Sequence, residues 1–150
     1  MSKGTATVLC IDDEQTALQL RQTVLESAGY RVLTAKSGAL GIQVFKSEPI
    51  HAVVLDYWMA DMNGMQVARE IRRLNPAVPI IILSAYGELL DESLGIADIW
   101  IRKGEEDRIE PGLRYFGVRR RIAHDLQLRA DIHHVHLISI IVFTVNHFVE

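Results

Sequence analysis

Strand-like runs alternate with segments of helical periodicity along residues 7–124, and this alternation constrains the fold more than any other feature. The predicted strands are residues 7–11, 31–35, 52–55, 80–83 and 98–101. Several of them are almost continuously apolar, which is typical of strands that helices cover on both faces of a sheet. Strands that alternate with helices form βαβ units, and such units build a parallel sheet.

The segments between these runs are predicted helices. They are residues 15–28, 38–45, 65–74, 88–94 and 111–124. Gly29 follows the first helix, where glycine commonly ends a helix, and Ser37 is placed to cap the second. Five such units predict an α/β fold with a doubly wound, flavodoxin-like parallel sheet of five strands in the order 2-1-3-4-5.

The composition excludes some classes of protein. The chain has 150 residues, which fits one domain better than two. Its net charge of −3 is not the overall positive charge typical of nucleic-acid-binding domains, and we interpret the basic cluster at residues 119–121 as a solvated helix face, so we expect no direct nucleic-acid binding. The longest uncharged apolar stretch, residues 135–149, is short and interrupted for a membrane span, and no secretory signal begins the chain. We expect a cytoplasmic protein without a membrane span, with Cys10 as a buried structural thiol.

Polar side chains follow four of the five predicted strands. Asp12 and Asp13 follow the first strand, Asp56 the third, Ser84 the fourth and Lys103 the fifth. In a doubly wound sheet, ligands bind beyond the carboxyl ends of the strands, where the strand order reverses. The fold therefore predicts that these five side chains converge at one edge of the sheet.

The residue types at this edge suit phosphoryl transfer. Three crowded carboxylates repel one another, and Mg²⁺ prefers such oxygen ligands. A carboxylate can act as a nucleophile and carry an acyl phosphate, while a lysine and a hydroxyl bind phosphate oxygens. Each residue alone also fits an ordinary role: Asp12 as a helix cap, Asp56 in a turn, Lys103 at the surface. The coincidence of four strand ends favours a pocket in which an aspartate is phosphorylated.

Four segments resemble the receiver domains of response regulators. They are residues 8–14 (VLCIDDE), 55–64 (LDYWMADMNG), 82–87 (ILSAYG) and 97–103 (ADIWIRK). The resemblance implies that Asp56 accepts a phosphoryl group from a histidine kinase or a phosphotransfer protein. It implies that Asp13 binds Mg²⁺ directly, that Asp12 acts through water, and that the backbone carbonyl of Trp58 completes the metal site.

The same resemblance implies a switch. Ser84 and Lys103 would bind the phosphoryl oxygens, Ser84 would move toward the phosphate, and the aromatic ring of Trp100 would swing inward. The rearranged surface would then contact a downstream protein target. Such a domain accepts phosphate on itself and is not an enzyme with an external substrate. A phosphatase that uses an aspartyl phosphate would need a second aspartate two residues after Asp56, where this chain has Trp58.

Departures from the family pattern leave an alternative open. Ala60 and Gly104 stand where the family usually has proline, which implies a less rigid loop after Asp56 and a less fixed backbone after Lys103. The segment between Ser84 and Trp100 is also about one helical turn shorter than usual. The alternative is a degenerate receiver that serves as a constitutive protein-interaction or dimerisation module.

The end of the chain changes character. We divide the chain into a receiver domain of residues 1–124 and an atypical apolar extension of residues 125–150. The extension is predicted to pack on the receiver or on a second copy of the chain, which makes a homodimer a candidate assembly. Its histidines lack the pattern of a metal site, and no helix-turn-helix is recognisable in it.

Overall fold

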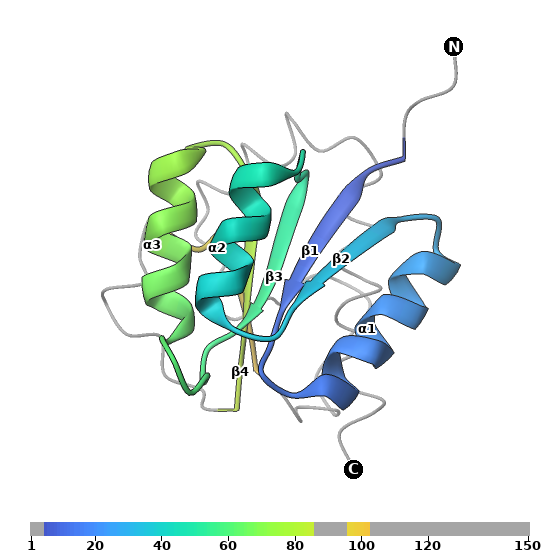
Figure 1. The fold of residues 1–150 in the computed structure, drawn as a ribbon, viewed down its shortest axis with the longest axis horizontal. Coiled ribbons are helices and arrows are strands. Elements are labelled where there is room, and N and C mark those ends of the chain that lie inside the picture. The colour runs from blue at the N-terminus through green and yellow to red at the C-terminus, as the bar shows by residue number, and fades with distance from the viewer. Residues whose placement is uncertain (1–4, 86–95, 103–150) are drawn as a thin grey trace, which may run out of the picture.

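The computed structural model describes residues 5–85 and 96–102, which form alternating strands and helices (Figure 1). In chain order they are β1 (Thr7–Ile11), α1 (Gln15–Ser27), β2 (Arg31–Ala35), α2 (Gly38–Ser47), β3 (Ala52–Asp56), α3 (Gly64–Leu74), β4 (Ile80–Ser84) and β5 (Ile99–Arg102). All five predicted strands are present, and each begins and ends within one residue of its predicted bounds.

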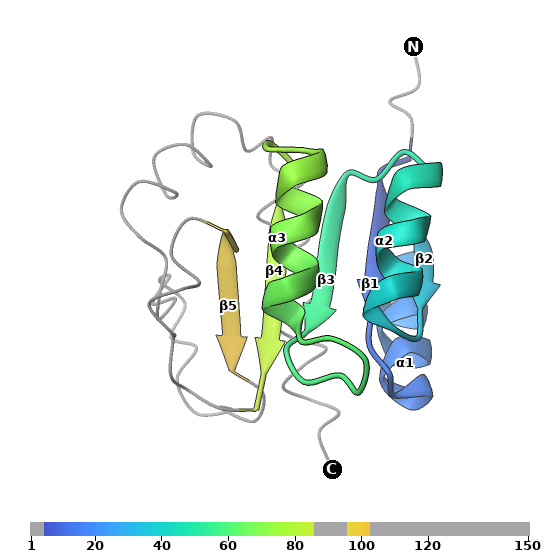
Figure 2. The same ribbon diagram turned by 60° about the vertical axis from the view of Figure 1, so that its left-hand side comes forward.

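The strands form one parallel sheet in the order β2-β1-β3-β4-β5, so the predicted topology is confirmed. The order reverses between β1 and β3, which are direct neighbours. The arrowheads of β4 and β5 point in the same direction in Figure 2. The switch point of the sheet therefore lies at the carboxyl ends of β1 and β3, where such folds place their ligand sites.

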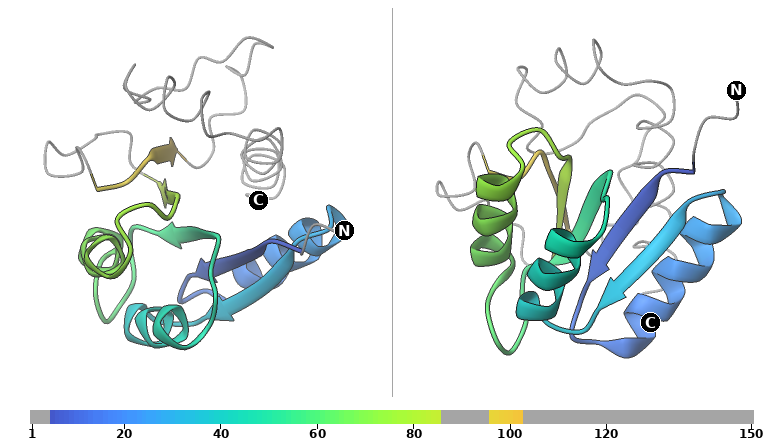
Figure 3. Two further views of the ribbon diagram at one scale, coloured as in Figure 1. Left: turned by 90° about the horizontal axis from the view of Figure 1, so that it is seen from above. Right: turned by 45° about the horizontal axis from the view of Figure 1, so that its top comes forward.

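The sheet is covered on both faces. α2 and α3 pack on one face, and α1 packs on the other (Figure 3). Because successive side chains of a strand point to opposite faces, Val8 and Cys10 join Leu18 of α1 in one apolar cluster, while Leu9 joins Ile71 of α3 in the other. This double coverage explains why the strand sequences are continuously apolar.

The helix ends follow local sequence signals. The Ser37 side chain accepts a hydrogen bond from the Leu40 N–H, which confirms its predicted role as a cap. Gly29 lies just beyond α1 with a φ of 95°, a left-handed conformation that glycine adopts without strain. α2 continues to Ser47, two residues past its predicted end, because its last turn is completed by a hydrogen bond from Glu48 N–H to the Val44 carbonyl.

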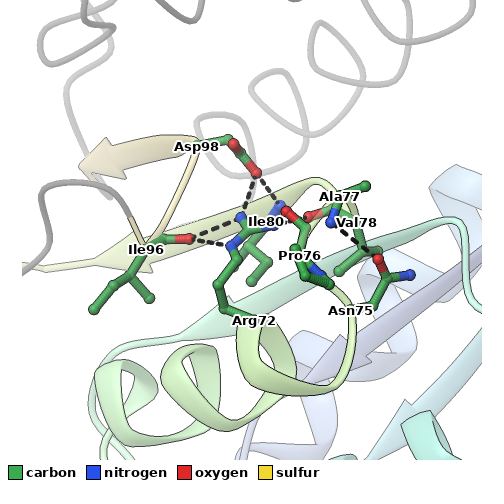
Figure 4. A network of polar contacts seen from close by, with 8 residues as sticks. All are labelled: Arg72, Asn75, Pro76, Ala77, Val78, Ile80, Ile96 and Asp98. Carbon is green, nitrogen blue, oxygen red and sulfur yellow. Dashed lines mark hydrogen bonds and ion pairs between the residues drawn. The ribbon is translucent and has the colours of Figure 1, made fainter.

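Arg72 joins α3 to the two strands at one edge of the sheet (Figure 4). Its guanidinium donates to the carbonyl oxygens of Pro76, Val78 and Ile96, at 2.7 to 3.1 Å. It also pairs with Asp98 Oδ2 at 2.9 Å, which accepts in turn from the Ile80 N–H. These bonds fix the start of β4 and the residues just before β5. They therefore hold the amino ends of both strands, opposite the carboxyl ends at which Ser84 and Arg102 lie.

The predicted helices at residues 88–94 and 111–124 lie outside the described residues, as does the extension of residues 125–150. Within residues 5–85 and 96–102, no helix combines the length and the apolar character that crossing a bilayer requires.

Candidate functional site: an acidic cluster at the switch point

Three carboxylates meet at the switch point of the sheet. Asp12 follows β1 and Asp56 ends β3, and the two strands pair in register from Val8 with Ala52 to Ile11 with Leu55. One carboxylate oxygen from each of Asp12, Asp13 and Asp56 lies within 4.8 Å of the others. We call these three residues the acidic cluster. Asp12 and Asp56 are buried, and Asp13 is exposed to solvent.

The geometry of the acidic cluster fits a magnesium ion. Mg²⁺ lies about 2.1 Å from its oxygen ligands in an octahedral arrangement, so opposite ligands are about 4.2 Å apart. The oxygen separations of up to 4.8 Å lie close to that span. Carboxylate oxygens are also the donors that this ion prefers, and an exposed Asp13 leaves a route from solvent.

Ser84 ends β4, the strand next to β3, and is buried with 1% of its surface exposed. Asp56 pairs with Leu83 in the register of these strands, so Ser84 lies one residue further toward the carboxyl edge. Lys103 directly follows β5 and lies outside the described residues. The structure thus places Ser84 at the same edge as the acidic cluster.

Asp12 is fixed by two hydrogen bonds. Its Oδ1 accepts from the Glu14 N–H at 3.0 Å, and its Oδ2 accepts from the Arg21 guanidinium at 2.7 Å. The first contact is a local turn, as expected if Asp12 had only a structural role. Asp12 is not the N-cap of α1, because Glu14 holds that position and no side chain caps the helix there. The second contact was not anticipated from the sequence. Its signal was the helical spacing that puts Arg21 on the same face as Leu18 and Leu25.

The loop after β3 is tied to its surroundings at two neighbouring residues. The Ala60 N–H donates to Asp13 Oδ2 at 3.1 Å, a bond that a proline in this place could not make. Asp61 accepts hydrogen bonds from the Gly38 and Ala39 N–H groups at the start of α2. Because Ala60 replaces a proline, the sequence predicts a less rigid loop. These two contacts, neither of which was predicted from the sequence, hold the loop in place instead.

Hydrogen bonding also sets the acidity of Asp61. Partial burial acts to raise its pKa, but hydrogen bonds from the Ala39 and Gly38 N–H groups outweigh this effect, and the pKa lies below its ordinary value. An anion at a helix N-terminus is stabilised in this way.

Aromatic side chains extend from the acidic cluster toward β5. Trp58, in the loop after Asp56, is 57% exposed, and its ring meets the ring of Tyr57 edge-on at 5.1 Å. The Tyr57 ring lies 5.3 Å from that of Trp100, which is only 8% exposed. The large ring of Trp100 is therefore accommodated inside, although its Nε1 has no hydrogen-bond partner among the described residues.

Comparison with known sequences identifies the family. The family described as response regulator receiver domain matches residues 8–97. The transcriptional regulatory protein GlrR of Escherichia coli is 42% identical over 91 residues, which are 61% of this chain and 20% of that protein. ZraR of Salmonella typhimurium is 30% identical over 136 residues, 88% of this chain and 30% of that protein. The chain thus spans about a fifth to a third of these relatives.

Solved structures agree with this assignment. A receiver domain from Clostridium thermocellum is 36% identical with a TM-score of 0.60, covering 65% of this chain and 82% of that one. The response regulator TrrA from Thermotoga maritima, solved in complex with Mg²⁺–BeF, is 31% identical with a TM-score of 0.63, covering 67% and 89%. Since the family match spans more than half of the sequence and the fold agrees, this chain belongs to the response regulator receiver domain family.

Proposed function

We propose that this chain is the phosphoacceptor receiver of a two-component phosphorelay and that Asp56 takes the phosphoryl group. The observation that carries the proposal is the convergence of Asp12, Asp13 and Asp56 at the switch point. Asp56 ends a buried strand in the middle of the sheet, so its carboxylate has a defined position for in-line attack. The chain is a signalling domain that accepts phosphate on itself rather than an enzyme with an external substrate.

In the proposed reaction, a carboxylate oxygen of Asp56 attacks the phosphorus of a phosphohistidine on the partner. The phosphorus–nitrogen bond breaks, and its electron pair stays on the imidazole nitrogen, which takes up a proton. The product is an acyl phosphate on Asp56. Asp13, with Asp12 acting through water and the Trp58 carbonyl, would hold Mg²⁺, which supplies positive charge for the transferring oxygens. TrrA, a similar protein, was solved in complex with Mg²⁺–BeF.

Ser84 and Lys103 complete the proposed pocket. The Ser84 hydroxyl lies at the end of the neighbouring strand and can donate to a phosphoryl oxygen. Lys103 follows β5 and would bring an ammonium group to another oxygen. Movement of Ser84 toward the phosphate, together with repacking of Trp100 against Tyr57, would carry the signal to the surface near β5.

The proposed partners are a sensor histidine kinase or phosphotransfer protein and a downstream protein target. A similar chain was solved in a complex of the histidine kinase ThkA with TrrA, at 31% identity and a TM-score of 0.62. We propose a cytoplasmic location, as is typical of such regulators. The division into a receiver of residues 1–124 and an extension of residues 125–150, and a homodimer formed through that extension, stay proposals.

The expected absence of nucleic-acid binding needs revision. The curated relatives are named transcriptional regulators, and this chain spans only 20% to 30% of the lengths of GlrR and ZraR. We propose that the receiver acts on transcription when it is joined to an output region of that kind. The expectation that no nucleic acid is contacted is therefore limited to the receiver itself.

Nothing in the described residues favours the alternative of a degenerate receiver. The observations behind it were the short helix predicted at residues 88–94, Gly104 and the apolar extension, which all lie outside those residues. The convergence of the three carboxylates of the acidic cluster supports phosphorylation instead.

Phosphorylation by a small donor tests the proposal. With a small acyl phosphate and Mg²⁺, the protein should gain the mass of one phosphoryl group, and Asp56→Asn should remove this gain. Glu48→Gln is the matched control, because Glu48 caps the end of α2 and lies outside the acidic cluster. An Asp56→Asn variant that acquires the same adduct would contradict the assignment of Asp56.

A further inference from the structure

Arg21 occupies a position in α1 where an apolar residue would be expected. The buried residues of this helix are Leu18, Arg21 and Leu25, which share one face against the sheet. The side chain of Arg21 is 8% exposed and that of Asp12 is 2% exposed, and their closest atoms are 2.7 Å apart. Both partners of this ion pair are thus almost fully buried, whereas the pairs Arg31–Glu48 and Arg73–Glu70 are more open to solvent.

Fold stability alone does not explain such a pair. Removing two charges from water costs free energy that their attraction barely recovers, and well-packed apolar residues are often as stable or more so. The surroundings are indeed apolar. Cys10, Leu18 and Leu25 are all buried in the apolar cluster on this face of the sheet. Water therefore screens the charge of Arg21 poorly here, and this charge acts on the acidic cluster through Asp12.

We propose that Arg21 is a built-in counter-cation of the acidic cluster, a positioning residue that holds Asp12 and weakens the binding of the divalent ion. This inference rests on the proposed function insofar as the acidic cluster is the magnesium site. Arg21 neutralises one of three carboxylates before any ion arrives, so the ion gains less on binding. Arg21 thereby sets the magnesium concentration at which the pocket becomes competent.

Two contacts of Asp12 lead to this conclusion. Its Oδ2 is engaged by Arg21 and its Oδ1 by the Glu14 N–H, so the orientation of the carboxylate is set without an ion. A divalent ion that binds nearby must therefore share Asp12 with the guanidinium, and the positive charge of the guanidinium repels the ion. If the guanidinium is removed, Asp12 becomes a buried carboxylate without its counter-charge, and the divalent ion becomes its best partner.

The test compares Arg21→Met with the wild type and with a control. Magnesium affinity is measured from the tryptophan fluorescence, since Trp58 is exposed beside the cluster, and stability is measured by urea unfolding with and without MgCl₂. Arg21→Met should unfold at lower urea without magnesium, bind magnesium at least about tenfold more tightly, and regain most of its stability when the ion is added. Arg72→Met is the control, because Arg72 lies at the other end of the sheet and should lower stability without changing magnesium affinity.

Each outcome decides the matter. If Arg21→Met loses stability but binds magnesium as the wild type does, Arg21 is merely structural and the inference is overturned. If Arg21→Met does not fold without magnesium, folding on addition of the ion supports the inference. If Arg21→Met fails to fold even with the ion present, the inference is overturned.

The proposed function fails in a different way. A wild type that neither binds magnesium nor accepts a phosphoryl group would remove the proposed function itself, and with it the basis of this inference. A wild type that does both, beside an Arg21→Met variant of unchanged affinity, leaves the proposed function intact and removes only the role of Arg21.

Discussion

The backbone N–H of Ala60 donates a hydrogen bond to Asp13 Oδ2, which joins the loop after β3 to the loop after β1. Asp12 and Asp13 of the acidic cluster lie in the loop after β1, and Asp56 is the last residue of β3, directly before the other loop. The contact therefore couples the backbone just beyond Asp56 to a carboxylate that would bind the metal ion.

Ala60→Pro is expected to weaken magnesium binding severalfold with little change in stability. The lost hydrogen bond to a charged group costs about 1.5–3 kcal/mol when buried and less at this exposed site, while proline stabilises by restricting the unfolded chain by about 0.4–1 kcal/mol. The two effects on unfolding largely cancel, but Asp13 loses the donor that orients it. A fluorescence titration compares Ala60→Pro with Ala60→Ser, which keeps the N–H. Equal affinity in the two variants would contradict the expectation.

Arg72→Met is expected to lower the free energy of unfolding by about 2–4 kcal/mol, because three carbonyl oxygens and Asp98 lose a charged donor in a partly buried place. Urea unfolding measures the change. Arg73→Met is the neighbouring control: the Arg73 side chain is largely exposed and pairs with Glu70 at the surface of α3, so its loss should change stability little. Similar losses in the two variants would show that the network of Figure 4 is not the cause.

Asp61→Asn is expected to destabilise the protein near neutral pH but not in acid. Hydrogen bonds from α2 lower the folded-state pKa of Asp61 below its ordinary value of 3.8, so the contribution is present above that value and is lost as the pH falls through the folded-state pKa. Unfolding curves of the wild type and the variant should therefore converge at low pH. A difference that stays constant over the whole pH range would rule out this linkage.

Cys10 is expected to resist alkylation in the folded protein. It is fully buried in β1, and burial raises the pKa of its thiol to about 12, so almost no thiolate forms at mildly alkaline pH. Mass spectrometry after treatment with iodoacetamide should show one adduct in urea and none under native conditions. Rapid native labelling would mean that β1 opens readily.

Much of this fold is written in local patterns. The runs that became β1 and β3 are apolar because helices cover both faces, and the parallel order follows from the alternation of strands and helices. Asp12, Asp13, Asp56 and Ser84 were expected at one edge because the carboxyl ends of parallel strands share that edge. The structure brings the three aspartates together and places Ser84 on the adjoining strand.

The contacts between elements were decided only by the tertiary structure. Both the burial of Arg21 on the face of α1 that holds Leu18 and Leu25 and its pairing with Asp12 depend on how that helix docks on β1. The same holds for Ala60 with Asp13 and for Asp61 with α2, whose partners are 47 and about 22 residues away in the chain. Periodicity is a property of neighbouring residues, whereas a hydrogen bond requires two atoms to lie within about 3 Å, a condition that is met only once the helices have packed on the sheet.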